Sequence, residues 1–509
     1  MASRSRGNAF RLAAIALLAS AFAGCGRAPT PSVAPAIATE AVRAPKPAFE
    51  WRDAVLYFAL IDRFADGDSA NDANVDRTAK GTFHGGDLAG LTAHLDEIAS
   101  LGVNAIWINP VVKNIDGFVT GAGFPDWAYH GYWADDFLRI DRRFGNEEQL
   151  DAFVDACHRR GIKVLLDVVY NHAGYGSRYL TDPRTKDWFR TEERGTCGQD
   201  DVTSCVAGLP DFETERPEVA KFLLDAQLGW AKRANVDGFR LDTVKHLAHP
   251  FWQEHRRRTR AELGNDFFLL GEVWGGDRES LDPWFEPDEL DAGFDFGFGG
   301  SAVGFLLGRG RAVAFDRYLA SREKVRAGHL LAQFLSSHDV KGALSELGFD
   351  TALFRLAAVL EMTVSGIPTI YYGEEVARRG GDWPDNRSDM PWGERKILPG
   401  EGAPRDEALR AFYTKLIGIR RAHPALARGR HAALSTEGDA YVYARQDAAE
   451  TLAVAVNRSA EPRTARFTAP ASWSGKEVVD LLGGAAPRTS GGEIELEMEG
   501  KGARILAAR

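Results

Sequence analysis

An arginine and an aspartate two residues apart offer the clearest chemistry in this sequence of 509 residues. Arg240 and Asp242 lie in the apolar stretch 236–242, which predicts a short buried strand. Because side chains alternate along a strand, both leave it on the same side. A neighbouring guanidinium lowers the pKa of a carboxylate and keeps it ionised, as a nucleophile must be. Taken alone, the pair is better explained as a structural salt bridge.

Eight apolar runs predict the strands that would position this pair. They are 55–61, 103–109, 163–169, 236–241, 267–273, 291–296, 330–335 and 368–372. Helical patterns such as 91–100, 147–160 and 219–233 alternate with them. Eight strand–helix units predict an α/β fold, a closed (β/α)8 TIM barrel with its active site at the C-terminal ends of the strands.

Three carboxylates fall at the ends of predicted strands four, five and seven: Asp242, Glu272 and Asp339. One acid in such a place is more often a salt-bridge partner or a helix cap, but three indicate a shared site. Glycosidic cleavage needs an ionised carboxylate opposite a protonated one. Arg240 favours Asp242 as the nucleophile. The apolar neighbours Val273 and Trp274 would raise the pKa of Glu272, which suits a general acid.

Four ordered motifs at 167–172, 238–242, 271–274 and 334–339 resemble the signature stretches of the α-amylase family, glycoside hydrolase family 13. The resemblance covers the chain from about residue 49 to its end. It implies cleavage with retention of the α-configuration, with Asp242 as nucleophile and Glu272 as acid/base. It also implies that Asp339 stabilises the transition state through the sugar hydroxyls.

The same resemblance implies a set of sugar contacts around the carboxylates. His130 would bond the sugar and Tyr132 would stack on it, although such aromatic clusters standing alone are more often core. Lys245 and His246 resemble the pair on the leaving-group side. The full expected set is His130, Tyr132, Trp133, His172, Arg240, Lys245, His246, His338 and Arg387.

Two groups of oxygen-bearing residues predict calcium binding, at one site or at two. The family binds calcium with residues matching Asn171, Asp211 and the backbone carbonyl of His246. The second group resembles the N-terminal calcium loop of cyclodextrin glucanotransferases and related amylases: Asp66, Asp68, Asn71, Asp72, Gly85 and Asp87. A solvated turn is a serious alternative for the second group.

The N-terminus predicts export. Three arginines precede an apolar run at 12–22, and the ending 22–25 resembles a bacterial lipoprotein cleavage box with Cys25 as the lipidated residue. Ordinary secretion is the alternative. We therefore expect a signal at 1–25, a tether rich in proline and alanine at 26–48 and a membrane link only through the lipid.

The remaining chain divides into three expected parts. The barrel comprises 49–170 and 214–425, a non-periodic insert occupies 171–213, and short alternating runs at 426–509 predict an antiparallel β-sandwich. Cys197 and Cys205 in the insert are expected to form a disulfide in an exported protein. Cys157 lies on the apolar side of a helical pattern and is expected to be a buried free thiol.

Composition and motif details narrow the function. The net charge is 62 − 72 = −10 and the basic residues are scattered, so no nucleic-acid surface is expected.

The motifs depart from the family pattern at a few positions. Ser337 stands where many α-amylases have Asn, as in cyclodextrin- and pullulan-cleaving relatives, and Trp383 replaces a usual Asp. Those relatives usually carry an extra N-terminal domain, and cyclodextrin glucanotransferases have an aromatic residue where this chain has Ala207.

These features predict an endo-acting α-amylase that cuts the α-1,4 bonds of starch, glycogen or maltooligosaccharides. A transglycosylase and a cyclomaltodextrinase or neopullulanase of the same family remain alternatives. A non-catalytic glucan-binding protein is a further one, although its expected sign is a missing acid and all three acids are present.

Overall fold

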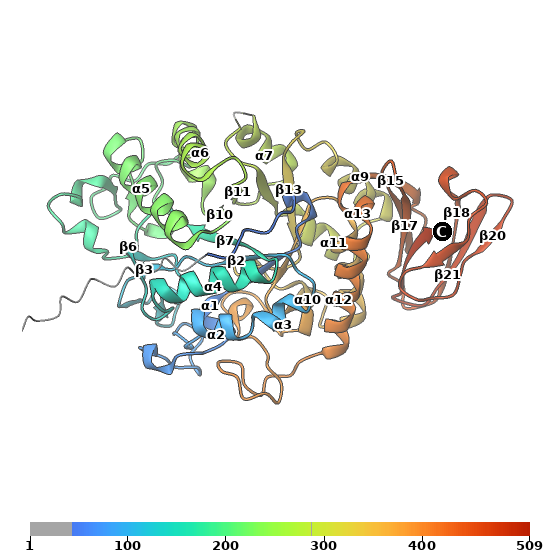
Figure 1. The fold of residues 1–509 in the computed structure, drawn as a ribbon, viewed down its shortest axis with the longest axis horizontal. Helices are drawn as coiled ribbons and strands as arrows, with labels where there is room; N and C mark the ends of the chain where they lie inside the picture. Colours follow the sequence, from blue (N-terminus) through green and yellow to red (C-terminus); the bar gives the residue numbers. More distant parts are fainter. Residues whose placement is uncertain (1–42, 287) are drawn as a thin grey trace, which may run out of the picture. The chain divides into compact units, whose positions relative to one another are not determined.

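Eight parallel strands close into a barrel in the computed structural model, which describes residues 43–286 and 288–509 (Figure 1). In spatial order they are β1 (Leu56–Ala59), β14 (Ile367–Tyr371), β13 (Leu330–Phe334), β12 (Ala292–Asp295), β11 (Phe268–Gly271), β10 (Gly238–Leu241), β7 (Lys163–Val168) and β2 (Ala105–Ile108). Each of the eight predicted strands is present, shifted or shortened by one or two residues at some ends. The (β/α)8 barrel is therefore confirmed.

The strand register places the ends of β7, β10 and β11 side by side. Leu241 pairs with Val168 on one side and Gly271 on the other, so Asp242 and Glu272 follow neighbouring strand ends. Gly238 permits this close pairing, because a Cβ there would lie 2.4 Å from the carbonyl oxygen of Phe268.

Helices cover the outside of the barrel (Figure 1). The longer ones are α4 (Glu147–Arg159), α5 (Pro217–Ala234), α6 (His249–Leu263), α7 (Arg278–Phe285), α8 (Gly297–Leu306), α9 (Ala312–Arg322), α11 (Thr351–Thr363) and α12 (Glu407–Ala422). A reciprocal capping box of Asn146 and Gln149 begins α4. The single helix expected at 91–100 is wrong, because the chain breaks at His94 into α2 (Leu88–Ala93) and α3 (Leu95–Ala99).

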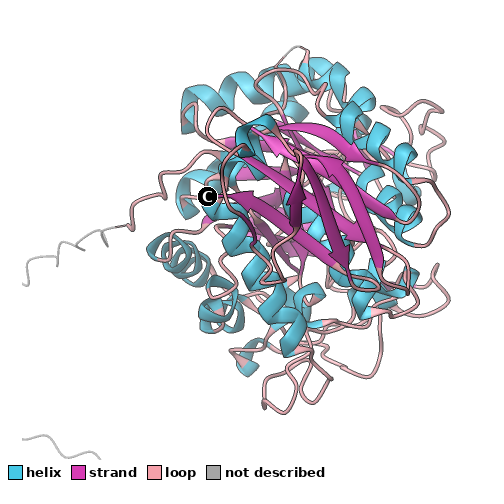
Figure 2. Cartoon of the chain, turned by 90° about the vertical axis from the view of Figure 1, so that its right-hand side faces the viewer, coloured by secondary structure: helices cyan, strands magenta, loops and turns pink. Residues whose placement is uncertain are grey.

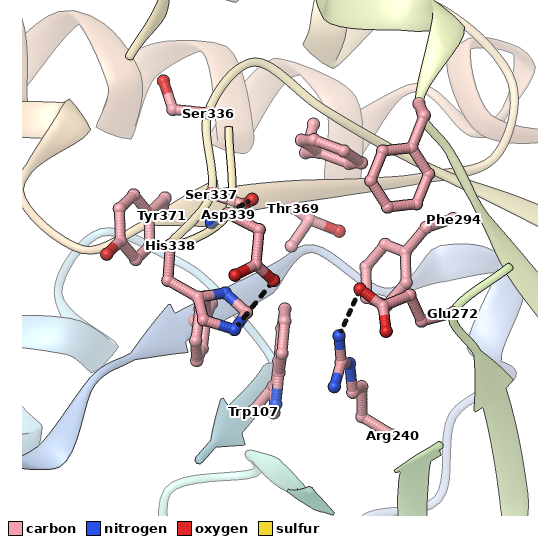
Figure 3. A pocket seen from close by; sticks show the side chains of 13 residues that line it. Trp107, Arg240, Glu272, Phe294, Ser336, Ser337, His338, Asp339, Thr369 and Tyr371 are labelled. Atoms are coloured by element: carbon pink, nitrogen blue, oxygen red, sulfur yellow. Dashed lines mark hydrogen bonds and ion pairs between the residues drawn. The ribbon is translucent and has the colours of Figure 1, made fainter. Parts of the chain in front are cut away.

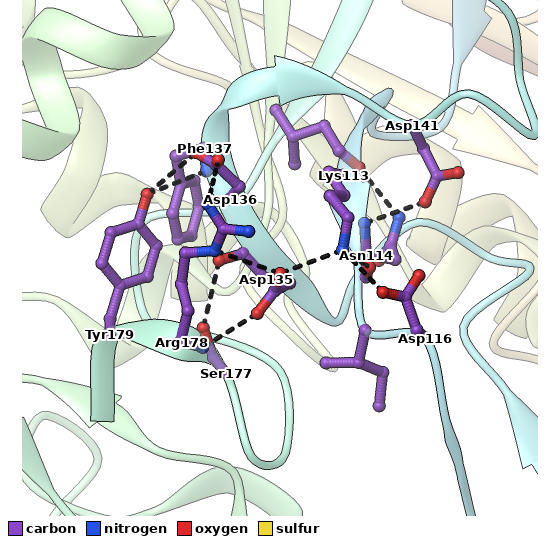
Figure 4. Close-up of polar contacts among 12 residues, drawn as sticks. Lys113, Asn114, Asp116, Asp135, Asp136, Phe137, Asp141, Ser177, Arg178 and Tyr179 are labelled. Atoms are coloured by element: carbon purple, nitrogen blue, oxygen red, sulfur yellow. Dashed lines mark hydrogen bonds and ion pairs between the residues drawn. The ribbon is translucent and has the colours of Figure 1, made fainter. Parts of the chain in front are cut away.

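Two excursions from the barrel pack together through charged side chains (Figure 4). One contains β3 (Val112–Asn114) and β6 (Ala134–Ile140); the other is the insert, with β8 (Phe189–Arg190) and β9 (Asp211–Phe212). Arg178 of the insert bonds Asp136 of β6 at 2.8 Å, and its backbone N–H donates to Asp135 at 2.8 Å. Lys113 bonds the same Asp135 at 3.0 Å. The expected disulfide joins Cys197 and Cys205 within the insert.

Antiparallel strands follow the barrel and confirm the predicted β domain (Figure 2). One sheet has the order β15 (Arg430–Ser435), β16 (Ala440–Gln446), β17 (Thr451–Asn457), β22 (Ala503–Ala508) and β19 (Val478–Asp480). The other is β18 (Arg463–Thr468), β21 (Glu493–Met498) and β20 (Arg488–Ser490). Side chains of both sheets enclose a second apolar core that includes Trp473.

Cys157 is buried without a disulfide, as expected. Among the described residues, no helix has the length and apolar character to cross a membrane. The proposed signal and Cys25 lie outside the described residues.

The buried side chain of Arg322 links strands β12 and β13 to the residues just before β14. Arg322 of α9 donates to Asp295 of β12 at 2.6 Å, to Gln333 of β13 at 2.9 Å and to the carbonyl oxygen of Ser365, just before β14, at 2.9 Å. Arg322 and Asp295 expose 2% and 1% of their side chains. Removing one partner of such a pair leaves a buried charge without compensation.

Arg322→Ala should therefore lower the free energy of unfolding by about 3 kcal/mol or more. Thermal unfolding followed by circular dichroism measures the loss, with Arg317→Ala as the control because Arg317 is an exposed arginine of the same helix. Equal melting temperatures for the two variants would contradict this account of the barrel.

Candidate active site

A buried guanidinium, that of Arg240, lies among the strand-end carboxylates, and Figure 3 shows its contact with Glu272. Arg240, 2% exposed, bonds Asp242 through one terminal nitrogen at 2.6 Å and Glu272 through the other at 2.9 Å. The first nitrogen also bonds Asp167 at 3.1 Å. The sequence prediction paired Arg240 with Asp242 alone. The structure makes it the shared partner of three acids, so it acts on the site by positioning them.

Glu272 lies in a setting that favours its protonated form. Its pKa is raised to about 8, chiefly by burial; the Arg240 guanidinium opposes this shift, and the charges of Asp242 and Asp339 add to it. The backbone N–H of Thr243 donates to Oε2 at 3.0 Å and fixes the carboxyl group.

The apolar surroundings of Glu272 differ from the expectation. A small cavity of 20 Å³ beside Glu272 is walled by Phe294, Phe296 and Phe334 (Figure 3). Trp274 was expected to contribute, but 48% of it is exposed. The apolar setting therefore comes from distant strands of the barrel, rather than from the next residues in sequence.

Asp339 is held in the ionised state by Arg387 and by His338, a histidine whose own pKa burial lowers to about 3. His338 bonds one carboxylate oxygen at 3.0 Å and Arg387 bonds the other at 3.1 Å. Burial acts to raise the pKa of Asp339, but His338 and Arg387 outweigh it and the pKa is lowered. The ring of His338 stacks on Tyr132 at 5.3 Å, with 13° between the planes.

A cavity of 260 Å³ opens above these groups. Its lining comprises Asp126, His130, Tyr132, Trp133, His172, Leu209, Asp242, His338, Asp339, Trp383 and Arg387. Six of the nine expected sugar contacts thus meet around two of the catalytic candidates. Arg240 lies below them, and the two remaining residues contact the insert: Lys245 and His246 approach Asp201 at 3.7 and 2.7 Å.

Sequence reasoning gave no role to Asp167, which opens the first signature motif. Its Oδ2 accepts hydrogen bonds from Tyr132 at 2.7 Å and from Trp107 at 3.0 Å. Trp107 also lies under the Arg240 guanidinium, 5.0 Å from it. Burial raises the pKa of Asp167 to about 7, and Asp242 contributes. Its position within the motif was the available signal.

The residues of the first expected calcium site do not fit a divalent cation. The Arg190 guanidinium bonds Oδ2 of Asp211 at 2.9 Å and also bonds Glu215 at 2.5 Å. Oδ1 of Asp211 has no hydrogen-bond partner among the described residues. A Ca²⁺ ion bound to Oδ1 of Asp211 would be repelled by the Arg190 guanidinium, which binds the other oxygen of the same carboxylate. The amide of Asn171 would add no negative charge to offset this repulsion. A side-chain cation therefore joins β8 to β9, where the resemblance implied a metal.

The residues of the second expected site also include an arginine, because Arg77 bonds Asp66 at 2.9 Å and lies 3.7 Å from Asp72. They differ from the first site in having four acids near this one positive charge. Asp66, Asp68, Asp72 and Asp87 crowd together, and burial together with the charge of Asp66 raises the pKa of Asp72. The side-chain oxygens Oδ1 of Asn71 and Oδ1 of Asp72 are buried and, within the described chain, have no hydrogen-bond partner. Asp87 accepts from Asn71 at 2.8 Å. One orphaned carboxylate oxygen and one orphaned amide oxygen are oxygen donors of the kind that Ca²⁺ takes, but among the described residues no three acids are grouped as a metal site.

Comparison with known proteins gives consistent matches along the chain. The model of the alpha amylase catalytic domain matches residues 58–411, and that of the alpha-amylase C-terminal domain matches 429–506. A cyclomaltodextrinase from a Bacillus species is 32% identical over 440 residues, which cover 82% of this chain and 74% of that protein. Neopullulanase 2 of Thermoactinomyces vulgaris is 31% identical over 477 residues, covering 88% and 77%.

Solved structures agree with the family match. An α-amylase from Anoxybacillus superposes with a TM-score of 0.81 at 30% identity, covering 91% of this chain and 99% of that one.

Proposed function

Because the chain belongs to the α-amylase family, glycoside hydrolase family 13, and is an α-glucan hydrolase of that family, we propose that it cleaves α-1,4 bonds in short and cyclic maltooligosaccharides with retention of configuration. The observation that carries the chemistry is the shared guanidinium, which holds Asp242 and Glu272 together while burial raises the pKa of Glu272 to about 8.

The proposed reaction has two steps. Asp242 attacks the anomeric carbon while Glu272 gives its proton to the leaving oxygen, which yields a covalent glycosyl-enzyme. Glu272, now ionised, takes a proton from water, and the water displaces Asp242. Asp339, held by His338 and Arg387, accepts hydrogen bonds from the sugar hydroxyls, which strengthen at the transition state.

The preference for short and cyclic substrates rests on the relatives. Cyclomaltodextrinase and neopullulanase 2 match more than four-fifths of this chain, which favours the alternative drawn from the sequence over an endo-acting amylase. Ser337, which such relatives share before the His–Asp pair, supports the same reading. A starch-cutting α-amylase is the second candidate, because the Anoxybacillus α-amylase has nearly the same extent as this chain.

Calcium binding and export belong to the same proposal. We place one Ca²⁺ at the loop of Asp66, Asp68, Asn71, Asp72 and Asp87, with Gly85 close enough that a Cβ there would lie 2.6 Å from Asp72. Its part is structural, because an ion there would join the loop at 66–72 to Gly85 and Asp87, which directly precede α2. We further propose that the chain is exported and retained at the bacterial cell envelope through a lipid on Cys25.

A substrate panel tests the function. Purified protein should hydrolyse β-cyclodextrin and maltotriose faster than starch, measured as reducing ends, while Glu272→Gln should lower kcat by about 10² to 10⁴-fold. Glu279→Gln, at an exposed glutamate of α7, is the control. Faster cleavage of starch would favour the second candidate, and full activity of Glu272→Gln would remove the acid from its role.

The pH dependence follows from the state that Glu272 must have. Its protonated form is the active one, and its pKa is raised from 4.5 to about 8, so kcat/KM should fall as pH rises through about 8. Initial rates with maltotriose between pH 5 and 10 measure this limb. A decline beginning near pH 4.5 would show that the acid is not shifted.

Removal of calcium by a chelator should lower the melting temperature, and the loss should come only from the proposed site at Asp66, Asp68, Asn71, Asp72 and Asp87. We expect EDTA to lower the melting temperature of the wild type and added Ca²⁺ to restore it, because the ion binds only the folded loop. Asp72→Asn should lose most of this response. Asp211→Asn, which alters the site already filled by Arg190, should keep it. An unchanged wild-type melting temperature, with no calcium by elemental analysis, would contradict the proposal.

A further inference from the structure

The loop that the disulfide closes contacts the barrel at a turn next to the active site. Cys197 and Cys205 are both partly exposed, and Asp201 lies midway between them. The backbone carbonyl oxygen of Asp201 accepts a hydrogen bond from Nδ1 of His246 at 2.7 Å, and its carboxylate lies 3.7 Å from Nζ of Lys245. The carboxylate is 64% exposed, so the ion pair is weak. The contact therefore depends mainly on the path of the loop backbone.

Hydrogen bonds inside the loop fix this path. The carboxylate of Asp200 accepts from the backbone N–H groups of Val202 and Thr203 at 3.0 Å each, and from the Thr203 hydroxyl at 2.6 Å. The N–H of Gly198 donates to the carbonyl oxygen of Thr203 at 2.8 Å. Because the disulfide joins the two ends, much of the entropy of closing the loop is already lost before Asp201 meets the barrel.

The turn that Asp201 contacts also holds the proposed acid. Thr243 precedes the short 3₁₀ turn Val244–His246 and has a left-handed backbone, with φ 49° and ψ 40°. A β-branched residue seldom adopts this conformation, so its surroundings must hold it there. The N–H of Thr243 donates to Oε2 of Glu272 at 3.0 Å, and the N–H of Val244 donates to the carbonyl oxygen of Glu272 at 2.9 Å.

The same turn is anchored at two further points. Trp252 of α6 is fully buried and donates from Nε1 to the carbonyl oxygen of Val244 at 2.9 Å. The other anchor is the partly exposed contact of Lys245 and His246 with Asp201. The first anchor belongs to the core, whereas the second depends on a loop whose shape a chemical change at the surface can alter.

We propose that the loop closed by Cys197 and Cys205 is a redox-sensitive positioning device for Glu272. While the disulfide is intact, the loop holds the turn through Asp201, and the turn keeps the N–H of Thr243 on the carboxyl group of the acid.

Reduction by a dithiol opens the loop. The S–S bond breaks, two electrons and two protons pass from the dithiol to Cys197 and Cys205, and the dithiol becomes a disulfide. The loop then gains conformational freedom and no longer holds the turn. Glu272 loses its fixed orientation toward the leaving oxygen, and transfer of its proton slows.

The inference rests on the proposed function, in which Glu272 protonates the leaving oxygen, but makes a separate demand. Reduction should slow only those substrates whose leaving group needs a proton. Maltotriose needs one, whereas fluoride leaves α-maltosyl fluoride without one. The value of kcat/KM for the fluoride therefore reports the attack of Asp242 without the help of the acid.

The test compares the two substrates with oxidised wild type and with wild type reduced by dithiothreitol. Reduction should lower kcat/KM for maltotriose by about tenfold and leave kcat/KM for α-maltosyl fluoride within about twofold of the oxidised enzyme. Re-oxidation should restore the rate with maltotriose.

Cysteine variants separate the disulfide from other effects of the reductant. The double variant Cys197→Ser, Cys205→Ser should behave as the reduced wild type does, and dithiothreitol should not change it further. Cys157→Ser is the matched control, because Cys157 is a buried free thiol, and this variant should respond to dithiothreitol as the wild type does.

Each outcome bears on the proposal. Equal losses on both substrates would mean that the loop supports the site as a whole, and would overturn it. Unchanged rates, with both thiols shown to be free by alkylation and mass spectrometry, would overturn it as well. If the wild type cleaves neither substrate, the proposed function fails first, and hydrogen exchange decides the inference. Reduction should then still speed exchange in the peptide that contains Thr243, and unchanged exchange there would refute the positioning role.

Discussion

The site depends on one constraint: three buried carboxylates share a single buried guanidinium. Arg240 contacts Asp167, Asp242 and Glu272, and none of the three exposes more than a tenth of its surface. One positive charge cannot offset three negative ones away from water, so protons must remain on part of the set. The shortest bond, 2.6 Å, goes to Asp242. The raised pKa of Glu272 keeps a proton on that residue. Glu272 can therefore act as the acid, while Asp242 acts as the nucleophile.

The barrel makes that balance possible by its register and its apolar interior. Neighbouring strands end together because β10 pairs closely with β7 and β11, and Gly238 allows the approach. Phenylalanines from β12 and β13 remove water from Glu272, and Trp107 of β2 supports the guanidinium. The pKa of this acid is therefore set by residues far apart in sequence, while His172 and Leu209 of the insert line the cavity.

Much of the fold and of the active site could be predicted from the sequence. Apolar runs mark the buried strands, and a closed barrel brings the C-terminal ends of those strands to the same face. The three acids followed from that rule, and the expected sugar contacts followed from the resemblance to the family. Other features depended on tertiary contacts without periodicity: Arg190 meets Asp211 from 21 residues away within an irregular insert. The role assigned to Trp274 failed because sequence neighbours need not be spatial neighbours. Asp126 and Trp383 meet only in the folded chain.

The most direct test of the central claim is to trap the sugar on the nucleophile. In Glu272→Gln, α-maltosyl fluoride can still react with Asp242, because fluoride leaves without a proton, but the second step lacks its base. Mass spectrometry of the digested protein should then find one maltosyl group on the peptide that contains Asp242. A label on another carboxylate, or release of β-maltose by the wild type, would contradict the assignment of Asp242 as the nucleophile held by Arg240.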